Sequence, residues 1–247
     1  MDYGYIAFLA AGAAAGGFIN GLAGFGTALF ALGFWLQIMP PIMAVPIVVV
    51  MSVISGLQGA WVVRHAIFDQ PKRLARFLVP GIAGVPLGVA ALTALDPQYV
   101  KITIGGMMLF YGGFFVLSRS LPKFDRPTPI VDSVIGFLGG ILGGAASLSG
   151  ALPTMWCSMR PWTKTETRAV LQPFNIAILS LAAVVFILRG NYTWVVVQNI
   201  LLALPITLLF AQIGIALFKR LEDDQFRRLL ITMMFISGII LLAKELI

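Results

Sequence analysis

The chain has 247 residues, of which 59% are hydrophobic and 11% are charged, and its formal net charge is +7. A soluble domain draws about a quarter of its residues from the charged types, so this composition excludes a water-soluble protein and indicates a protein embedded in lipid. The Lys and Arg residues stand in short clusters between apolar runs and form no basic stripe. This pattern argues against a nucleic-acid partner and fits the positive-inside rule.

The chain begins with a long uncharged stretch, from Tyr3 to Val63, that holds more than one membrane span. Its first part, from Tyr3 to about Gln37, would be roughly 50 Å long as a single helix. Glycines occupy the middle of that part, and glycine weakens a helix interior. We therefore expect the first part to be a broken helix.

Further uncharged runs follow at residues 77–95, 102–118, 133–159, 169–188, 190–218 and 229–243. Most of them approach the roughly 20 residues that a helix needs to cross the hydrocarbon core of a bilayer. The run 133–159 is again rich in glycine, so it either crosses the membrane or dips in and returns to the same side. The sequence thus predicts an all-α polytopic membrane protein.

The basic residues favour returning hairpins over crossings for the two glycine-rich runs. They form four clusters: Arg64, Lys72, Arg73 and Arg76; Arg119, Lys123 and Arg126; Arg160, Lys164 and Arg168; and Lys219, Arg220, Arg227 and Arg228. If both runs are re-entrant hairpins, all four clusters face the cytoplasm, as the positive-inside rule requires. If the run 133–159 crosses, the clusters divide between the two sides. We therefore predict hairpins, with both chain ends in the periplasm.

Two sequence segments recur, which indicates an internal duplication. GFINGLAGFG (Gly17 to Gly26) is similar to GFLGGILGGA (Gly136 to Ala145), and DPQYVKITIGGMM from residue 96 is similar to DDQFRRLLITMMF from residue 223. We predict an N-terminal repeat at 1–120, a cytoplasmic linker at 121–132 and a C-terminal repeat at 133–247. Each repeat would be a hairpin plus three spans, so the second would be inverted relative to the first. The alternative for the glycines is close helix packing of the small-xxx-small kind.

The paired motifs GFINGLAGFG and GFLGGILGGA, one opening each half of the chain, resemble the TauE/SafE family of membrane transporters, also called sulfite exporters. The resemblance covers essentially the whole chain. It implies export, or sometimes uptake, of small sulfur-containing or organic anions such as sulfite, sulfoacetate and other sulfonates. The chain departs from the family's usual run of glycines, since the motifs continue here as GFGTAL and GGAASLSG. Hydroxyl groups would then replace some of the backbone contacts to an anion.

An anion in a cavity of low dielectric needs hydrogen-bond donors and a nearby cation. The candidate substrate-binding residues are Asn20, Gly24, Thr27, Gln58, Gly143, Ser147, Ser149, Arg168, Gln172 and Asn175. Arg168 and Gln172 are four residues apart and share one helix face, so together they would offer a charge and a donor. The alternative for Arg168 is an interfacial anchor, and the alternative for the hydroxyls is packing against helix carbonyls.

The acidic residues are all expected in loops or at the chain ends, which leaves no proton relay within the membrane. We therefore predict a potential-driven exporter of a small anion that needs no coupling ion. One His and one Cys provide neither a catalytic group nor a metal site, so no enzyme activity and no cofactor are expected. The remaining alternatives are an uptake permease for a non-sulfur anion such as a carboxylate, and a non-transporting assembly subunit. We expect a multi-pass protein of the bacterial inner membrane, in contact with lipid, for which a homodimer is plausible.

Overall fold

The structure is a computed structural model that describes residues 3–69, 71–94 and 126–222, with the isolated positions 102, 106, 109, 110, 113, 124 and 225. Within these ranges every regular element is an α-helix. The helices are α1 (Tyr3–Ala23), α2 (Thr27–Trp35), α3 (Pro41–Val62), α4 (Arg64–Asp69), α5 (Pro71–Ala94), α7 (Pro129–Ala146), α8 (Ala151–Ser158), α9 (Lys164–Leu188) and α10 (Trp194–Arg220).

Six of the described helices, α1, α3, α5, α7, α9 and α10, are long and apolar enough to cross a membrane. Large apolar side chains on their outer faces, such as Val79, Leu201 and Leu209, are about half exposed or more, as expected where lipid and not water covers the protein. The polytopic α-helical class predicted from composition is confirmed. Most of the expected spans 102–118 and 229–243 lies outside the described residues, and α7 begins inside the stretch predicted as the linker.

Each glycine-rich run is a long helix followed by a short return helix. In the first run the chain turns at Gly24 and Gly26, whose φ angles of 84° and 91° strongly favour glycine. In the second run it turns over residues 147–150, where Ser147 has a φ of 58°. The return helices α2 and α8 have 9 and 8 residues, and at about 1.5 Å per residue neither is long enough to cross a bilayer.

Most of each glycine motif lies inside α1 or α7, and only the first motif reaches a break, because its last residues, Gly24 to Gly26, form the turn. A Cβ at Gly21 would lie 2.0 Å from the carbonyl oxygen of Ala211 in α10, and a Cβ at Gly140 would lie 2.0 Å from that of Gly81 in α5. The packing alternative is therefore correct for these glycines. The first break thus lies at the end of its motif, and the second break, at residues 147–150, follows its motif.

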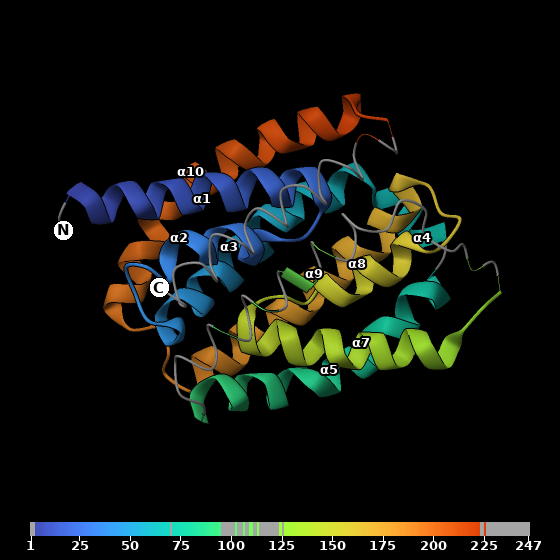
Figure 1. The fold of residues 1–247 in the computed structure, drawn as a ribbon, viewed down its shortest axis with the longest axis horizontal. Coiled ribbons are helices and arrows are strands. Elements are labelled where there is room, and N and C mark those ends of the chain that lie inside the picture. Colours follow the sequence, from blue (N-terminus) through green and yellow to red (C-terminus); the bar gives the residue numbers. More distant parts are fainter. Residues whose placement is uncertain are drawn as a thin grey trace.

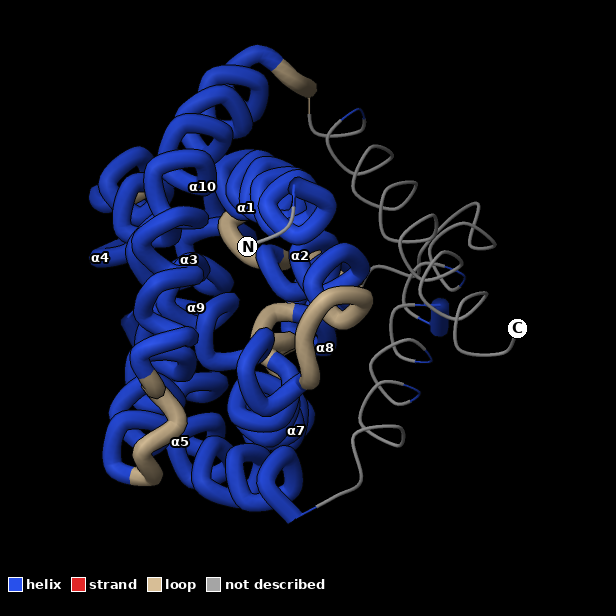
Figure 2. The backbone as a smooth tube through the Cα atoms, turned by 90° about the vertical axis from the view of Figure 1, so that its left-hand side faces the viewer, coloured by secondary structure: helices blue, strands red, loops and turns tan. Residues whose placement is uncertain are grey.

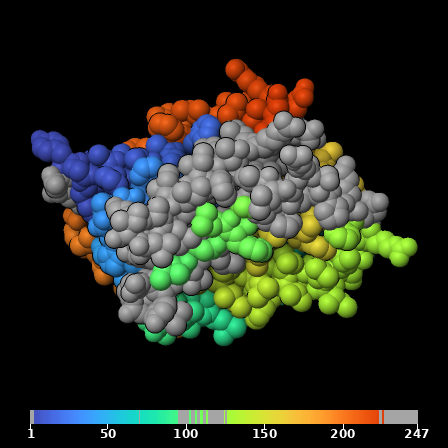
Figure 3. All heavy atoms as spheres, in the orientation of Figure 1, coloured from blue at the N-terminus to red at the C-terminus, as the bar shows by residue number. Residues whose placement is uncertain are grey.

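Two pairs of helices pack closely, and each pair takes one helix from the N-terminal and one from the C-terminal half of the chain. Residues 77, 81 and 85 of α5 pack in order against residues 136, 140 and 144 of α7, so this pair runs parallel; the pair α1 and α10 runs parallel in the same way. Between them α3 and α9 run antiparallel, since Gly56 lies near Ile176 and Gly59 near Arg168. The α1/α10 and α5/α7 pairs lie at opposite edges of the bundle, with α3 and α9 between (Figures 1 and 2). In the space-filling view the red-orange atoms of α10 lie at the top edge and the teal and yellow-green atoms of α5 and α7 at the bottom edge (Figure 3).

The described members of the basic clusters gather at one end of the bundle. Figure 1 shows α4, the start of α7, the start of α9 and the end of α10 all at that end. Direct contacts join them: Arg73 lies 3.5 Å from Glu166 of α9, and the ammonium of Lys164 contacts the carbonyl of Leu221 after α10. The described basic clusters therefore lie on one side of the bundle, the arrangement on which the hairpin prediction rests, and the re-entrant path of the two runs stays a prediction.

Candidate functional site

The side chain of Arg168 lies at the first break and not at the surface. It comes from the second turn of α9 and is only 1% exposed. Its Nη2 donates to the carbonyl of Gly21 at 2.9 Å, and its Nη1 donates to that of Leu22 at 3.3 Å. These are among the last carbonyls of α1, which have no partner inside their helix and carry the negative end of its dipole. Arg168 therefore caps the helix that leads into the first break.

No carboxylate of the described residues pairs with Arg168. Among those residues, the ion pairs join Asp132 and Glu166 to other arginines. The remaining contacts of Arg168 are neutral: its Nε donates to Gln172 at 3.1 Å, and its guanidinium lies 4.3 Å from the centroid of the Phe218 ring. A buried cation balanced only by dipoles and a ring favours an anion beside it.

Gln172 and two glycines of α3 allow this close arrangement. The Nε2 of Gln172 donates to the carbonyl of Gly56 at 3.0 Å. A Cβ at Gly59 would lie 2.6 Å from both Arg168 Nη2 and Gln172 Oε1, and a Cβ at Gly24 would lie 2.5 Å from the same oxygen. The predicted pair of Arg168 and Gln172 on one helix face is present, and it packs against backbone where glycine leaves room.

Asn20, one turn before the break, is held by α3. Its Nδ2 donates to the carbonyl of Ser52 at 3.0 Å and to the hydroxyl of Ser55 at 2.6 Å. The Ser55 hydroxyl in turn donates to the carbonyl of Met51. Asn20 is 1% exposed, and its Oδ1 has no hydrogen-bond partner among the described residues. Asn20 thus joins the first break to α3 and leaves one acceptor unused.

The second break is neutral where the first is charged. The hydroxyl of Ser149 donates to Oδ1 of Asn175, which lies on α9 one turn beyond Gln172. Gly143 packs directly against Ser149. Ser147 ends α7 in the left-handed conformation, and its buried hydroxyl is unpartnered among the described residues. Helix α9 therefore contacts both breaks, with Arg168 and Gln172 at the first and Asn175 at the second.

The two breaks touch each other. Phe25, between the two positive-φ glycines, is 1% exposed, and a Cβ at Gly150 would lie 2.7 Å from the Phe25 Cβ. Gly26 and Gly150 are the N-cap residues of α2 and α8. Because glycine has no side chain, neither residue can cap the free N–H groups of its helix. Two helix N-termini therefore begin near one point inside the bundle.

Two predicted residues, Thr27 and Gln58, are not joined to this cluster by hydrogen bonds between described side chains. Thr27 packs against Gly16 of α1, and its buried hydroxyl is unpartnered within the described chain. Gln58 is half-buried on α3, and its Oε1 is likewise buried and unpartnered there. Both keep free hydrogen-bonding capacity close to the elements that form the first break.

Asp132 is a buried carboxylate that was not predicted from the sequence. Asp132 was expected in a loop, but it lies in the first turn of α7 and is 4% exposed. Its Oδ1 lies 3.3 Å from Nη2 of Arg160, and its Oδ2 lies 3.8 Å from Nη1 of Arg76 on α5. The indole N–H of Trp156 on α8 donates to the same Oδ1 at 2.7 Å. The signal was present, because Pro129 at the first helical position with an acid in the first turn indicates a helix start.

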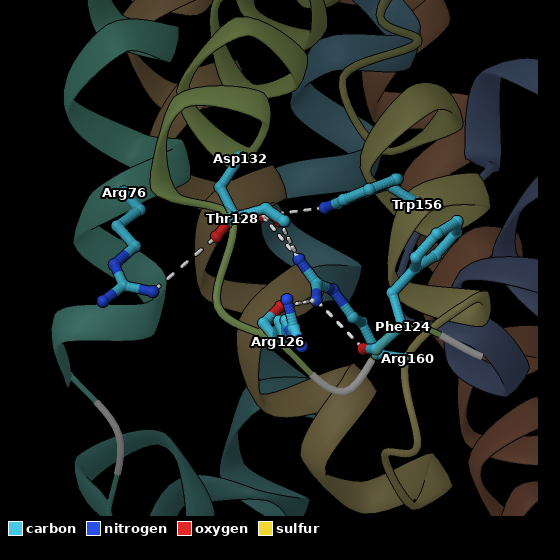
Figure 4. A network of polar contacts seen from close by, with 7 residues as sticks. All are labelled: Arg76, Phe124, Arg126, Thr128, Asp132, Trp156 and Arg160. Atoms are coloured by element: carbon cyan, nitrogen blue, oxygen red, sulfur yellow. Dashed lines mark hydrogen bonds and ion pairs between the residues drawn. The ribbon is translucent and has the colours of Figure 1, made fainter.

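Arg160 completes this network, which Figure 4 shows at the basic end of the bundle. Its guanidinium donates to the carbonyls of Phe124 and Arg126 and to the hydroxyl of Thr128, and it lies 4.8 Å from the Trp156 ring centroid. The network ties the start of α7 to the end of α8, so it closes the second hairpin at its base. Among the described residues no cluster of His, Cys, Asp and Glu is arranged to hold a metal ion.

Comparison with known proteins identifies one family. A family model described as "Sulfite exporter TauE/SafE" matches residues 8–241. A curated protein, NADH-ubiquinone oxidoreductase chain 2 of Suricata suricatta, is 34% identical over 95 residues, which is 38% of this chain and 26% of that protein. The chain thus spans about a quarter of the length of that relative. No solved structure gives a significant match.

Proposed function

Because the chain belongs to the TauE/SafE sulfite exporter family, a family of membrane transporters, we propose that it carries a small sulfur-containing anion, sulfite or an organosulfonate, through a site between its two broken helices. The observation that supports this most directly is Arg168. It is buried at the first break, and no carboxylate of the described residues neutralises it. A permanent positive charge in that position lowers the free energy of an anion that would otherwise be excluded from the membrane interior.

The groups around Arg168 can complete the binding of an oxyanion. The first N–H groups of α2, the N–H of Leu152 in α8 and the buried hydroxyls of Thr27 and Ser147 are hydrogen-bond donors near the meeting point of the breaks. The three oxygens on the sulfur of a sulfonate or sulfite accept such bonds from several directions at once. Bound anion and guanidinium would then form the charge-assisted contacts that are the strongest hydrogen bonds in proteins.

The corresponding helix pairs support an inverted repeat as the basis of alternating access. Counterpart helices of the two halves run in opposite directions, and the α1/α10 pair corresponds to the α5/α7 pair. In transporters built this way, rocking of one repeat against the other exposes a central site to each side in turn. An inside-negative potential drives a monovalent anion outward by about 2.3 kcal/mol per 100 mV, so export needs no coupling ion.

The test is thermal stabilisation of the purified protein by sulfite, sulfoacetate, other sulfonates, carboxylates and inorganic anions. A ligand that binds only the folded protein raises its unfolding temperature as its concentration rises. We expect one sulfur anion to stabilise the protein, Arg168→Gln to lose that response, and Arg168→Lys to keep part of it. The matched control is Arg189→Gln, since Arg189 is exposed and bonds only Thr93 among the described residues.

Flux of the stabilising anion into liposomes, with and without an imposed potential, then tests the driving force. A flux that does not change with the imposed potential would contradict the potential-driven mechanism. Stabilisation by carboxylates alone would replace a sulfur anion with a carboxylate as the substrate. No stabilisation by any anion, with Arg168→Gln behaving as the control, would contradict the transport proposal.

The second candidate is a non-transporting subunit of a membrane assembly. It is favoured by the partial match to a protein named as one chain of an oxidoreductase, which covers 38% of this chain. The same anion panel separates the two candidates, because an assembly subunit has no reason to respond to anions through Arg168.

A further inference from the structure

The first break presents hydrogen-bond acceptors as well as a cation. Asn20 donates both hydrogens of its Nδ2, to the Ser52 carbonyl and the Ser55 hydroxyl, and this fixes which end of the amide carries the oxygen. The remaining Oδ1 is buried and has no partner among the described residues. A buried acceptor without a donor costs about 1–3 kcal/mol, so a site that keeps one is built for a donor that arrives from elsewhere.

A second unpartnered acceptor lies on α3, one turn from the serine that holds Asn20. Gln58 follows Ser55 by three residues on α3, so the two side chains are neighbours on the same helix face. The Oε1 of Gln58 is buried and unpartnered within the described chain. Since Ser55 is the residue that holds Asn20, both free amide oxygens belong to the same part of the bundle.

Arg168 and its partner Gln172 bond the chain directly after Asn20 and directly after Ser55. Arg168 contacts Gly21 and Leu22, which directly follow Asn20, and Gln172 bonds Gly56, which directly follows Ser55. The pair of Asn20 and Ser55 and the pair of Arg168 and Gln172 therefore join the same two short stretches of α1 and α3. A simple anion would satisfy the guanidinium and leave both amide oxygens without a donor.

We infer that the ligand of this site is an anion that also carries an O–H or N–H donor, with Arg168 binding its negative oxygens and Asn20 and Gln58 accepting its hydrogens. A protonated oxyanion, a hydroxyalkanesulfonate and an aminoalkanesulfonate share this chemistry. A metal cation would also satisfy amide oxygens, but the uncompensated charge of Arg168 disfavours it. The inference rests on the proposed function. It adds to the anion-binding cation two groups that accept hydrogen bonds from the same ligand.

The test compares ethanesulfonate with 2-hydroxyethanesulfonate, which differ by one hydroxyl group, by thermal shift on the full-length protein. We expect the hydroxyl compound to bind about tenfold or more tightly to the wild type, because a site built to bond a hydroxyl leaves its own groups unpaired with the analogue that lacks it. In Asn20→Leu and in Gln58→Met this preference should fall several-fold. Taurine and sulfite, measured at several pH values, then separate N–H and protonated-oxygen donors.

The matched control is Asn191→Leu, because Asn191 also has a buried, unpartnered Oδ1 but lies in the turn between α9 and α10. The control should keep the full preference. If Asn20→Leu fails to fold, Gln58→Met tests the inference alone. The Oε1 that this substitution removes makes no hydrogen bond to a described residue, so the substitution should leave the fold intact. Stabilisation that requires sodium in place of choline would overturn the inference in favour of a cation at the amide oxygens.

Two further outcomes separate this inference from the proposed function. Equal, Arg168-dependent binding of both sulfonates would overturn the inference and leave the anion site intact. The inference also fails if the wild-type preference survives in both Asn20→Leu and Gln58→Met. Absence of any anion-dependent stabilisation in the wild type would overturn both proposals together.

Discussion

The two broken helices share one construction but are held in different ways. The first break receives its charge from the other half of the chain, because Arg168 of α9 caps the end of α1. The second hairpin is closed by an ion pair between its own ends, Asp132 and Arg160, and its break carries only the neutral Ser149–Asn175 contact. Among the described residues the first break is thus charged and the second is neutral, so the proposed anion would be bound closer to the first break.

The largest effect should come from removing the buried ion pair of the second hairpin. Asp132→Ala leaves the guanidinium of Arg160 buried without its counter-charge, which costs about 3–5 kcal/mol. The matched control is Glu166→Ala, which removes an equivalent first-turn acid whose partner Arg73 is 3.5 Å away and whose side chain is 42% exposed. That pair is worth below about 1 kcal/mol.

Unfolding of both variants in a denaturing detergent titration measures the difference. Equal losses for Asp132→Ala and Glu166→Ala would mean that the Asp132 network does not hold the hairpin. A loss of anion binding in Asp132→Ala without any loss of stability would instead connect the second hairpin to the substrate.

Replacing a glycine at a close helix contact should lower the stability of the protein equally in the two halves of the chain. Gly21→Ala and Gly140→Ala each place a Cβ 2.0 Å from a backbone carbonyl oxygen of the facing helix. Because backbone cannot rotate away, each substitution should cost about 1–3 kcal/mol. Gly33→Ala is the control, since a Cβ there meets nothing within 4 Å and should stabilise α2 by up to about 1 kcal/mol.

Thermal unfolding in the same detergent compares these three variants. A neutral Gly140→Ala beside a destabilised Gly21→Ala would show that the two helix pairs are not equivalent. Such a result would weaken the inverted-repeat proposal.

The contact between the breaks should appear as coupling between Phe25 and Gly150. Gly150→Ala pushes a Cβ into the space of the Phe25 side chain, and Phe25→Ala empties that space. The double variant should therefore be more stable than the sum of the single losses predicts, by about 0.5–3 kcal/mol. Additive losses in the double-mutant cycle would mean that Phe25 and Gly150 do not contact each other.

The smallest effects concern the left-handed residues of the breaks. Gly24→Ala imposes a φ of 84° on a residue with a Cβ and meets Gln172 at 2.5 Å, so a loss of about 1–2 kcal/mol is expected. Ser147→Gly at the second break relieves the same strain and should stay within about 0.5 kcal/mol of the wild type. Circular dichroism melts measure both. A weakened anion response in a stable Ser147→Gly protein would assign the Ser147 hydroxyl to binding.

The membrane class, most of the described spans and the presence of two broken segments followed from local sequence. Composition and the length of uncharged runs indicate membrane spans directly, because in lipid each helix must satisfy its own backbone hydrogen bonds and present apolar side chains. The spacing of Arg168 and Gln172 on one face also followed, since helix periodicity is local. The exact breaks did not, because glycine serves both close packing and left-handed turns, and only the facing helix distinguishes the two uses.

Only the tertiary structure shows which groups the buried polar side chains contact. Arg168 meets carbonyls 146 and 147 positions away, and Asn20 is held by α3 while its oxygen stays free. Asp132 is buried although it stands among loop-like residues, because Trp156 of α8 and Arg160, two residues after α8, both contact it. A sequence states which side chains are available and on which helix face they lie. Which of them neutralise one another, and which remain for a ligand, depends on how the two halves pack together.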